Sequence, residues 1–153
     1  MRNILSAIPI VLCCISCKSY LGPDHELEWY LKNNTSQEVY CIPHNFYEDE
    51  PEIGYLSPGD SILLARDERP VIQGISYFDT FWSDYGTGTD FRIYSADGTL
   101  LKEWKGENYN KPGRQFFRER HWRHYFRMQI DPYGIVWVFD LLPEDIEADG
   151  QVN

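Results

Sequence analysis

The sequence lacks the short motifs that mark the common enzyme classes. It has no G-x-S-x-G nucleophile motif and no H-E-x-x-H zinc motif. Cys41 lies in the middle of a predicted strand, which is a poor place for a catalytic nucleophile. Paired carboxylates are so plentiful in this acidic chain that they do not indicate glycosidase chemistry. We therefore expect no catalytic residue, no cofactor and no enzymatic activity.

The sequence also lacks an apolar run long enough to cross a membrane as a helix. Its most apolar stretch, Ile4 to Ile15, falls well short of the roughly 20 residues that a crossing requires. Because Arg2 precedes this stretch, the N-terminus has the charged and apolar regions of an export signal. The stretch ends in Ile15-Ser16-Cys17, which places a branched residue and a small residue before a cysteine.

This ending resembles the lipobox of bacterial lipoproteins, in which the signal peptidase cuts before a cysteine that carries a lipid on its sulfur. The resemblance implies a signal peptide over residues 1–16 and lipid attachment at Cys17, with the acyl anchor in outer-membrane lipid. Lys18, where an aspartate would imply inner-membrane retention, favours the outer membrane by the same resemblance. This signal is compatible with a domain that faces the periplasm and with one that faces the medium. The alternatives are a plain signal peptide and a hydrophobic N-terminal membrane anchor.

Cysteines are few, and the leader determines which of them can pair. Cys13 and Cys14 would leave with the leader and Cys17 would be lipidated, so Cys41 would have no partner in the mature chain. We therefore expect Cys41 to be buried as a small apolar residue. A free Cys17 would instead allow a disulfide with Cys41.

Basic residues are scarce relative to acidic ones. The chain has 14 Lys and Arg against 24 Asp and Glu, and a net charge of −10. Removing residues 1–16 removes Arg2 and no acid, which leaves the mature chain still more acidic. This balance disfavours nucleic acid and anionic membrane as partners of the whole surface.

The sequence has no pattern of a long amphipathic helix, and its apolar and aromatic residues are distributed as in β-strands. Aromatic residues make up 16% of the chain, and alternating apolar positions recur between short turns. We expect a hairpin of residues 27–31 and 38–42, a strand at 61–65 and another at 70–77, a loop over 79–90, and a hairpin of 91–94 and 99–104 around Asp97-Gly98. One or two helical turns before Trp122 and strands from there to Ile130 and over 135–142 complete the pattern, with a turn between them at Asp131 to Gly134.

This pattern predicts an all-β fold, an antiparallel two-sheet sandwich of immunoglobulin-like character with at most one or two short helices. A small β-barrel is the alternative. We expect a tether over residues 17–26, a single β-rich domain over 27–146 and an acidic tail over 147–153.

The leader, the Asn33-Asn34-Thr35 turn, the Ser57-Pro58-Gly59-Asp60 turn and the segment Trp137 to Leu141 together resemble small lipoproteins of Bacteroides-type bacteria. That resemblance implies an envelope location and a β-rich fold, and it implies no activity.

The clearest candidate site is a basic stretch over residues 111–127. It holds six of the 13 basic residues that follow the leader: Lys111, Arg114, Arg118, Arg120, Arg123 and Arg127. Arginines beside aromatic residues suit carboxylate, sulfate or phosphate groups on a polymer. We expect a ligand-binding surface formed by Arg118, Arg123, Tyr125 and Arg127 together with Trp82 and Tyr85 of the 79–90 loop. The alternative is that these arginines pair with acidic residues of the chain itself.

Other patterns are weaker. Asp84 and Asp90 alone do not complete a calcium loop, and His121 with His124 does not make a zinc site, so we expect no metal. Asp60-Ser61-Ile62 resembles the O-glycosylation acceptor of Bacteroides-type bacteria, which would place a glycan on Ser61.

The sequence therefore predicts a lipid-anchored cell-envelope protein that acts as a non-enzymatic binding or assembly accessory. Its expected partner is an anionic glycan or another envelope protein, and no nucleic acid. A purely structural envelope lipoprotein is the alternative, and a hydrolase without a recognisable motif is the third possibility.

Overall fold

The structure, a computed structural model, describes residues 24–41, 54–70, 76–86, 90–108, 110–127 and 134–147. Lipid attachment at Cys17, most of the predicted tether, the predicted turn at Asp131 and the tail beyond residue 147 lie outside these residues. None of the helices in the described residues is long and apolar enough to cross a membrane.

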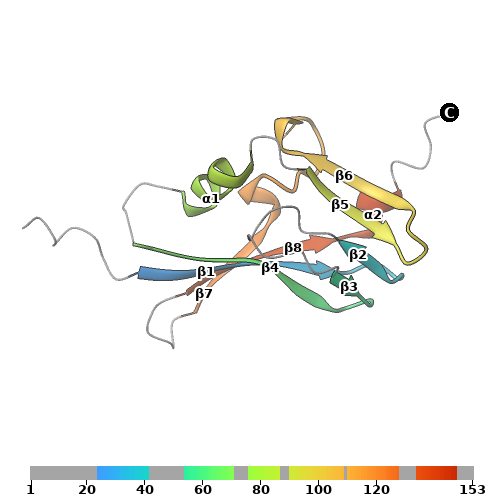
Figure 1. Cartoon of the computed structure of the whole chain (residues 1–153), viewed down its shortest axis with the longest axis horizontal. Helices are drawn as coiled ribbons and strands as arrows, with labels where there is room; N and C mark the ends of the chain where they lie inside the picture. Colours follow the sequence, from blue (N-terminus) through green and yellow to red (C-terminus); the bar gives the residue numbers. More distant parts are fainter. Residues whose placement is uncertain are drawn as a thin grey trace, which may run out of the picture.

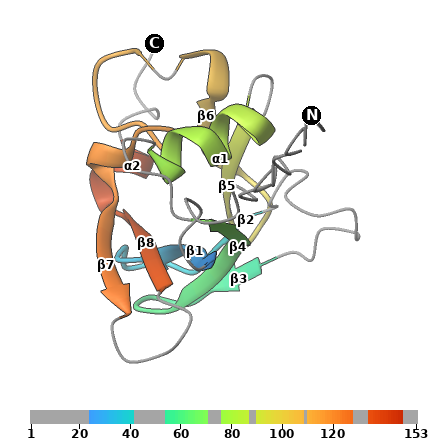
Figure 2. The same ribbon diagram turned by 90° about the vertical axis from the view of Figure 1, so that its left-hand side faces the viewer.

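The described strands form two sheets of four strands each (Figures 1 and 2). Sheet A has the order β4-β1-β8-β7 and contains β1 (Asp24–Asn33), β4 (Ser61–Pro70), β7 (Arg123–Arg127) and β8 (Gly134–Leu141). Sheet B has the order β3-β2-β5-β6 and contains β2 (Val39–Cys41), β3 (Gly54–Leu56), β5 (Asp90–Ser95) and β6 (Leu100–Lys105). The predicted two-sheet sandwich is confirmed, and the described strands do not close into the alternative barrel.

Sheet A departs from a purely antiparallel sheet at its centre. β1 pairs antiparallel with β4 but parallel with β8, from Glu26 opposite Gly134 to Asn33 opposite Leu141. The first and last described strands are therefore neighbours, and β7 extends the sheet beyond β8 as an antiparallel edge strand.

The predicted hairpin of residues 27–31 and 38–42 is wrong, because β1 and β2 belong to different sheets. The chain changes sheet at Asn33, whose buried side chain replaces the hydrogen bonds that a hairpin would make. The Asn33 amide donates to the carbonyls of Gln37 (2.9 Å) and Leu56 (3.0 Å), and its Oδ1 accepts from the N–H of Thr35 (3.0 Å). These bonds satisfy a buried polar group and direct the chain from one sheet to the other.

The predicted loop at 79–90 is also wrong in part, and most of the predicted strand at 70–77 lies outside the described residues, which include Tyr77 as the start of a helix. β4 continues to Pro70, and the helix α1 (Tyr77–Gly86) occupies most of the predicted loop. The backbone N–H of Asp79 donates to the Ser76 hydroxyl (3.1 Å), as at a helix N-terminus. Phe78, Phe81 and Trp82 follow the spacing of one helix face, and all three are buried.

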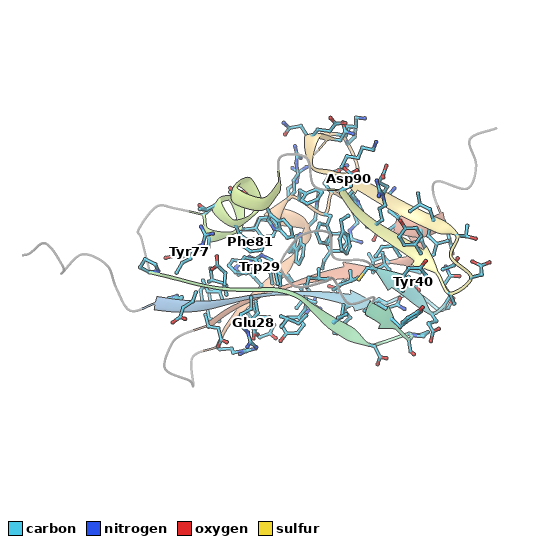
Figure 3. All side chains as sticks on the ribbon, viewed as in Figure 1. Glu28, Trp29, Tyr40, Tyr77, Phe81 and Asp90 are labelled. Atoms are coloured by element: carbon cyan, nitrogen blue, oxygen red, sulfur yellow. The ribbon has the colours of Figure 1, made fainter. Side chains whose placement is uncertain are left out.

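Helix α1 packs against the inner face of sheet A through aromatic rings (Figure 3). Trp29 of β1 stacks on Phe81 with a centroid distance of 3.9 Å and on Trp137 of β8 with 5.0 Å. Phe116 lies between the sheets, stacked on Phe91 of sheet B at 3.9 Å. The core is therefore an aromatic cluster to which both sheets and α1 contribute.

Other predictions are confirmed. β5 and β6 form the expected hairpin, with Gly98 at φ 89°, a conformation that favours glycine. A helical turn, η2 (Glu119–His121), precedes Trp122, and β7 follows it.

The prediction for Cys41 is also confirmed: it is buried and free, and burial raises the pKa of its thiol to about 12. Two further short helices, η1 (Gly106–Asn108) and α2 (Pro143–Glu147), follow β6 and β8.

Candidate functional site

The fold divides the basic stretch between two places. Arg123 and Arg127 lie with Tyr125 on the outer face of β7, while Lys111 and Arg114 lie beside β6 and α2. The predicted single surface is therefore not formed by the whole stretch.

The two arginines of β7 pair with acidic residues of sheet A. The Arg123 guanidinium donates to both carboxylate oxygens of Asp140, with 2.9 Å between Nη2 and Oδ1. Arg127 donates to Oε2 of Glu28 on β1, and its Nη1 lies 3.8 Å from Glu26. The alternative interpretation of the basic stretch, pairing within the chain, thus describes both residues. Tyr125 between them is half exposed.

Glu28 is the centre of this outer-face network (Figure 3). Its side chain is only 2% exposed, and it accepts hydrogen bonds from Arg127, from Arg66 of β4 (2.7 Å) and from the Tyr30 hydroxyl (3.2 Å). Burial and the Glu28 charge raise the pKa of Tyr30. The network ties three strands together, and it is satisfied without a ligand.

Of the two predicted aromatic members of the binding surface, Trp82 does not lie on it. Trp82 is 5% exposed, and its ring packs edge-on against Phe116 and Phe117, each at 5.3 Å between centroids. Trp82 is therefore a core residue, because α1 turns this face of the predicted loop inward. Tyr85 belongs to α1, but its side chain is outside the described residues. Arg118 donates to Oδ1 of Asn110 at 2.7 Å.

The structure also describes the predicted glycosylation position and the residues considered as metal ligands. Ser61 is exposed at the start of β4, so the glycosylation prediction remains a prediction. His121 accepts a hydrogen bond at Nδ1 from the N–H of Gln115 (2.9 Å), and burial lowers its pKa. Among the described residues, no group of three or more His, Cys, Asp and Glu side chains is arranged to hold a metal ion.

The structure places a cleft of about 400 Å³ where β6, the segment after η1 and α2 meet. This volume lies within the ~300–1,000 Å³ range of small-molecule sites. The cleft is lined by Lys102, Glu103, Trp104, Lys105, Asn108, Lys111, Pro112, Gly113, Arg114, Gln115, Glu144 and Asp145. Nine of these twelve residues have polar side chains, four cationic and three anionic, so the lining carries a formal net charge of +1 in a chain whose overall charge is strongly negative.

Arg114 and Asp145 hold the base of the cleft rigid. Arg114 donates through Nη1 to Asp145 and through Nη2 to the Asp140 carbonyl (2.8 Å), and its guanidinium lies 4.8 Å from the Phe139 ring centroid. Asp145 also accepts from the N–H of Leu142 (2.9 Å). Burial raises the pKa of the Asp145 carboxyl, and these two donors oppose that rise. Arg114 and Asp145 therefore form their hydrogen bonds within the protein, and the lysines of the cleft are the better candidates to bind a ligand.

Three lysines surround the cleft in different environments. The Lys102 ammonium lies 5.8 Å from the centroid of the Trp104 ring, and Lys105 lies 3.5 Å from Glu103. Lys111 is exposed and makes no ion pair with any described residue. These three ammonium groups line the same cleft as Asn108 and Glu144, whose side chains can form hydrogen bonds with hydroxyl groups.

Sequence reasoning found Lys111 and Arg114 but missed the cleft. Besides other residues of the same stretch, the members of the cleft come from β6, η1 and α2, and the contact between α2 and β6 brings these segments together. The short-range patterns of the chain carry no signal for that contact.

No protein-family model matches the chain, no curated protein matches its sequence, and no solved structure matches its fold. The resemblance to small lipoproteins of Bacteroides-type bacteria therefore stays a prediction.

Proposed function

We propose that the protein is a non-enzymatic binding domain, lipid-anchored through Cys17 in the outer membrane, and that its cleft beside β6 and α2 binds an acidic saccharide. The observation that carries the proposal is the convergence of Lys102, Lys105 and Lys111 on one polar cleft. A locally cationic site in a chain of net charge −10 favours a ligand that brings its own negative charge.

The lining supports a saccharide more than a small inorganic anion. Asn108, Gln115 and Glu144 add amide and carboxylate groups that can donate to or accept from hydroxyl groups. A cleft of about 400 Å³ has room for more than one small anion. The ligand class that combines carboxylate or sulfate groups with many hydroxyls is the acidic sugars.

The lining also favours binding over nucleophilic catalysis. Its described side chains include no serine, cysteine or histidine. Asp145, the most buried carboxyl of the cleft, already accepts hydrogen bonds from Arg114 and Leu142.

The test is calorimetric titration with galacturonate monomer and dimer, with the matching neutral galactose sugars as a comparison. We expect the acidic sugars to bind, with an affinity that falls as salt is added, and the neutral sugars to bind much more weakly. Neutralising one cleft cation in Lys111→Gln should weaken binding about tenfold, the usual effect of losing one charged hydrogen bond. Lys32→Gln, which removes the same charge on the outer face of sheet A, is the matched control and should bind as the wild type does.

Equal affinity for acidic and neutral sugars, or no effect of Lys111→Gln, would contradict the proposed cleft. Cleavage of the dimer on incubation would show a hydrolase instead.

A further inference from the structure

A row of four large side chains crosses the outer face of sheet B, one from each strand. Tyr55 of β3 pairs with Tyr40 of β2, Tyr40 pairs with Tyr94 of β5, and Tyr94 pairs with Leu100 of β6. We call these four residues the tyrosine row. The row spans three inter-strand gaps of about 4.8 Å, so it is about 14 Å long.

The rings of the tyrosine row contact one another, and its two ends are open. Tyr40, labelled in Figure 3, stacks on Tyr94 with 5.0 Å between centroids and 12° between planes, and it lies 5.4 Å from Tyr55. Tyr55 is 60% exposed and Leu100 is 49% exposed. The outer face of a two-layer sandwich normally carries polar residues, so a continuous apolar line at this position indicates a binding surface.

The tyrosine row shares its face of sheet B with two residues at the edge of the cleft, Glu103 and Lys105. Arg92 lies two residues before Tyr94 on β5, and its Nε donates to Glu103 of β6 at 2.6 Å. Glu103 in turn lines the cleft and lies 3.5 Å from Lys105. The outer face of sheet B therefore leads from Tyr55 across Tyr94 and the Arg92–Glu103 pair to Lys105, one of the residues that line the cleft.

We propose that the tyrosine row is a second subsite, which packs against successive sugar rings of an acidic polysaccharide whose charged group occupies the cleft. This inference rests on the proposed function and extends it from a single acidic sugar to a polymer. A tyrosine ring offers an apolar surface with a hydroxyl at its end, which suits a sugar ring that has apolar C–H faces and hydroxyl edges. A row about 14 Å long exceeds a single sugar, so affinity should grow with the length of the chain.

The experiment compares galacturonate oligomers from monomer to hexamer on the full chain and on Tyr55→Ala. In the wild type, affinity should rise over the first few units and then level off. Tyr55→Ala should weaken the hexamer about tenfold and leave the monomer unchanged, which reduces the dependence on length. Tyr55→Phe keeps the ring and should retain most of the rise. Phe126→Ala, a truncation of an equally exposed aromatic (61%) on an edge strand of sheet A, should match the wild type. Thermal unfolding of each variant verifies that it is folded.

The outcomes separate the two proposals. If the monomer binds through Lys111 but Tyr55→Ala keeps the full dependence on length, the tyrosine row is not a subsite and the cleft remains. If no acidic sugar of any length binds, both proposals are overturned. Self-association that Tyr55→Ala abolishes would assign the row to a second copy of the chain and overturn the saccharide subsite.

Discussion

Arg127 of β7 reaches across β8 to pair with Glu28 of β1. The residue of β8 opposite Arg127 is Gly134, and a Cβ at that position would lie 3.4 Å from two side-chain carbons of Arg127. The absence of a side chain at Gly134 thus gives the arginine a path over the strand to a carboxylate that Arg66 contacts from the other side.

This arrangement predicts that the Glu28 carboxylate stabilises sheet A. In Glu28→Ala, two arginines would lose a shared partner that is almost fully buried, which should lower the free energy of unfolding by about 2–3 kcal/mol. Urea unfolding followed by tryptophan fluorescence measures the change. Glu68→Ala removes an exposed carboxylate from β4 and should change stability by less than about 0.5 kcal/mol. Equal effects of the two substitutions would contradict a central role for Glu28.

A second prediction concerns how the contribution of Asp140 to stability depends on pH. The Arg123 hydrogen bonds and charge lower the pKa of Asp140 below its usual 3.8. A carboxyl with a lowered folded-state pKa stabilises the protein above the unfolded pKa, and this contribution is lost as the pH falls through the lowered value. The wild type should therefore be more stable than Asp140→Asn at pH 6, and the difference should disappear in acid below pH 3.8. Urea unfolding across this range measures it. A difference that is independent of pH would exclude the ion pair as its source.

Asp145 should behave in the opposite way. Burial raises the pKa of this carboxyl, so its ionisation opposes folding and that cost is relieved as the pH falls through the raised value. Relative to Asp145→Asn, the wild type should gain stability on acidification. The same urea series tests this prediction, and a parallel response of the two aspartates would contradict it.

The Cys41 thiol should be inert in the folded protein. With its pKa raised to about 12 and its side chain buried between the sheets, almost no thiolate forms at pH 8. In a chain whose other three cysteines are replaced by serine, a thiol reagent should modify Cys41 only after denaturant is added. Rapid modification of the native protein would show that the site is open.

The proposed lipid anchor at Cys17 predicts a specific labelling pattern. Cells fed a fatty-acid analogue should label the wild type and Cys41→Ala equally, because Cys41 is the buried cysteine of the domain. Cys17→Ala should carry no label. Label on Cys17→Ala would refute the lipobox.

Local patterns in the sequence predicted much of the fold. The Asp97-Gly98 pair predicts the β5–β6 hairpin because a positive φ at that turn favours glycine, alternating apolar residues predict β1, and a nearly continuous apolar run predicts β8. The same alternation does not tell a strand which partner it has. That is why β1 and β2 were assigned to one hairpin, whereas the buried Asn33 sends them to separate sheets. Helix α1 was not predicted, because its aromatic residues have a high strand propensity. The signal for the helix is the N-terminal hydrogen bond between Ser76 and Asp79 together with the spacing of the apolar residues.

The candidate site was less accessible to sequence reasoning, for the same reason. The sequence leaves Arg123 and Arg127 either facing a ligand or paired within the chain, because their partners Asp140 and Glu28 come from other strands. Tyr40, Tyr55 and Tyr94 are spread over three segments, and only their strand pairing makes them a row.

The parallel pairing of β1 with β8 also governs the order in which this domain can be completed. The ribosome makes β1 first and β8 last, yet the two are neighbours at the centre of sheet A. A growing chain that ends before Gly134 leaves β1 without one partner and β7 without its neighbour. The centre of sheet A can therefore be completed only after β8 has been synthesised, whereas every strand of sheet B is made earlier.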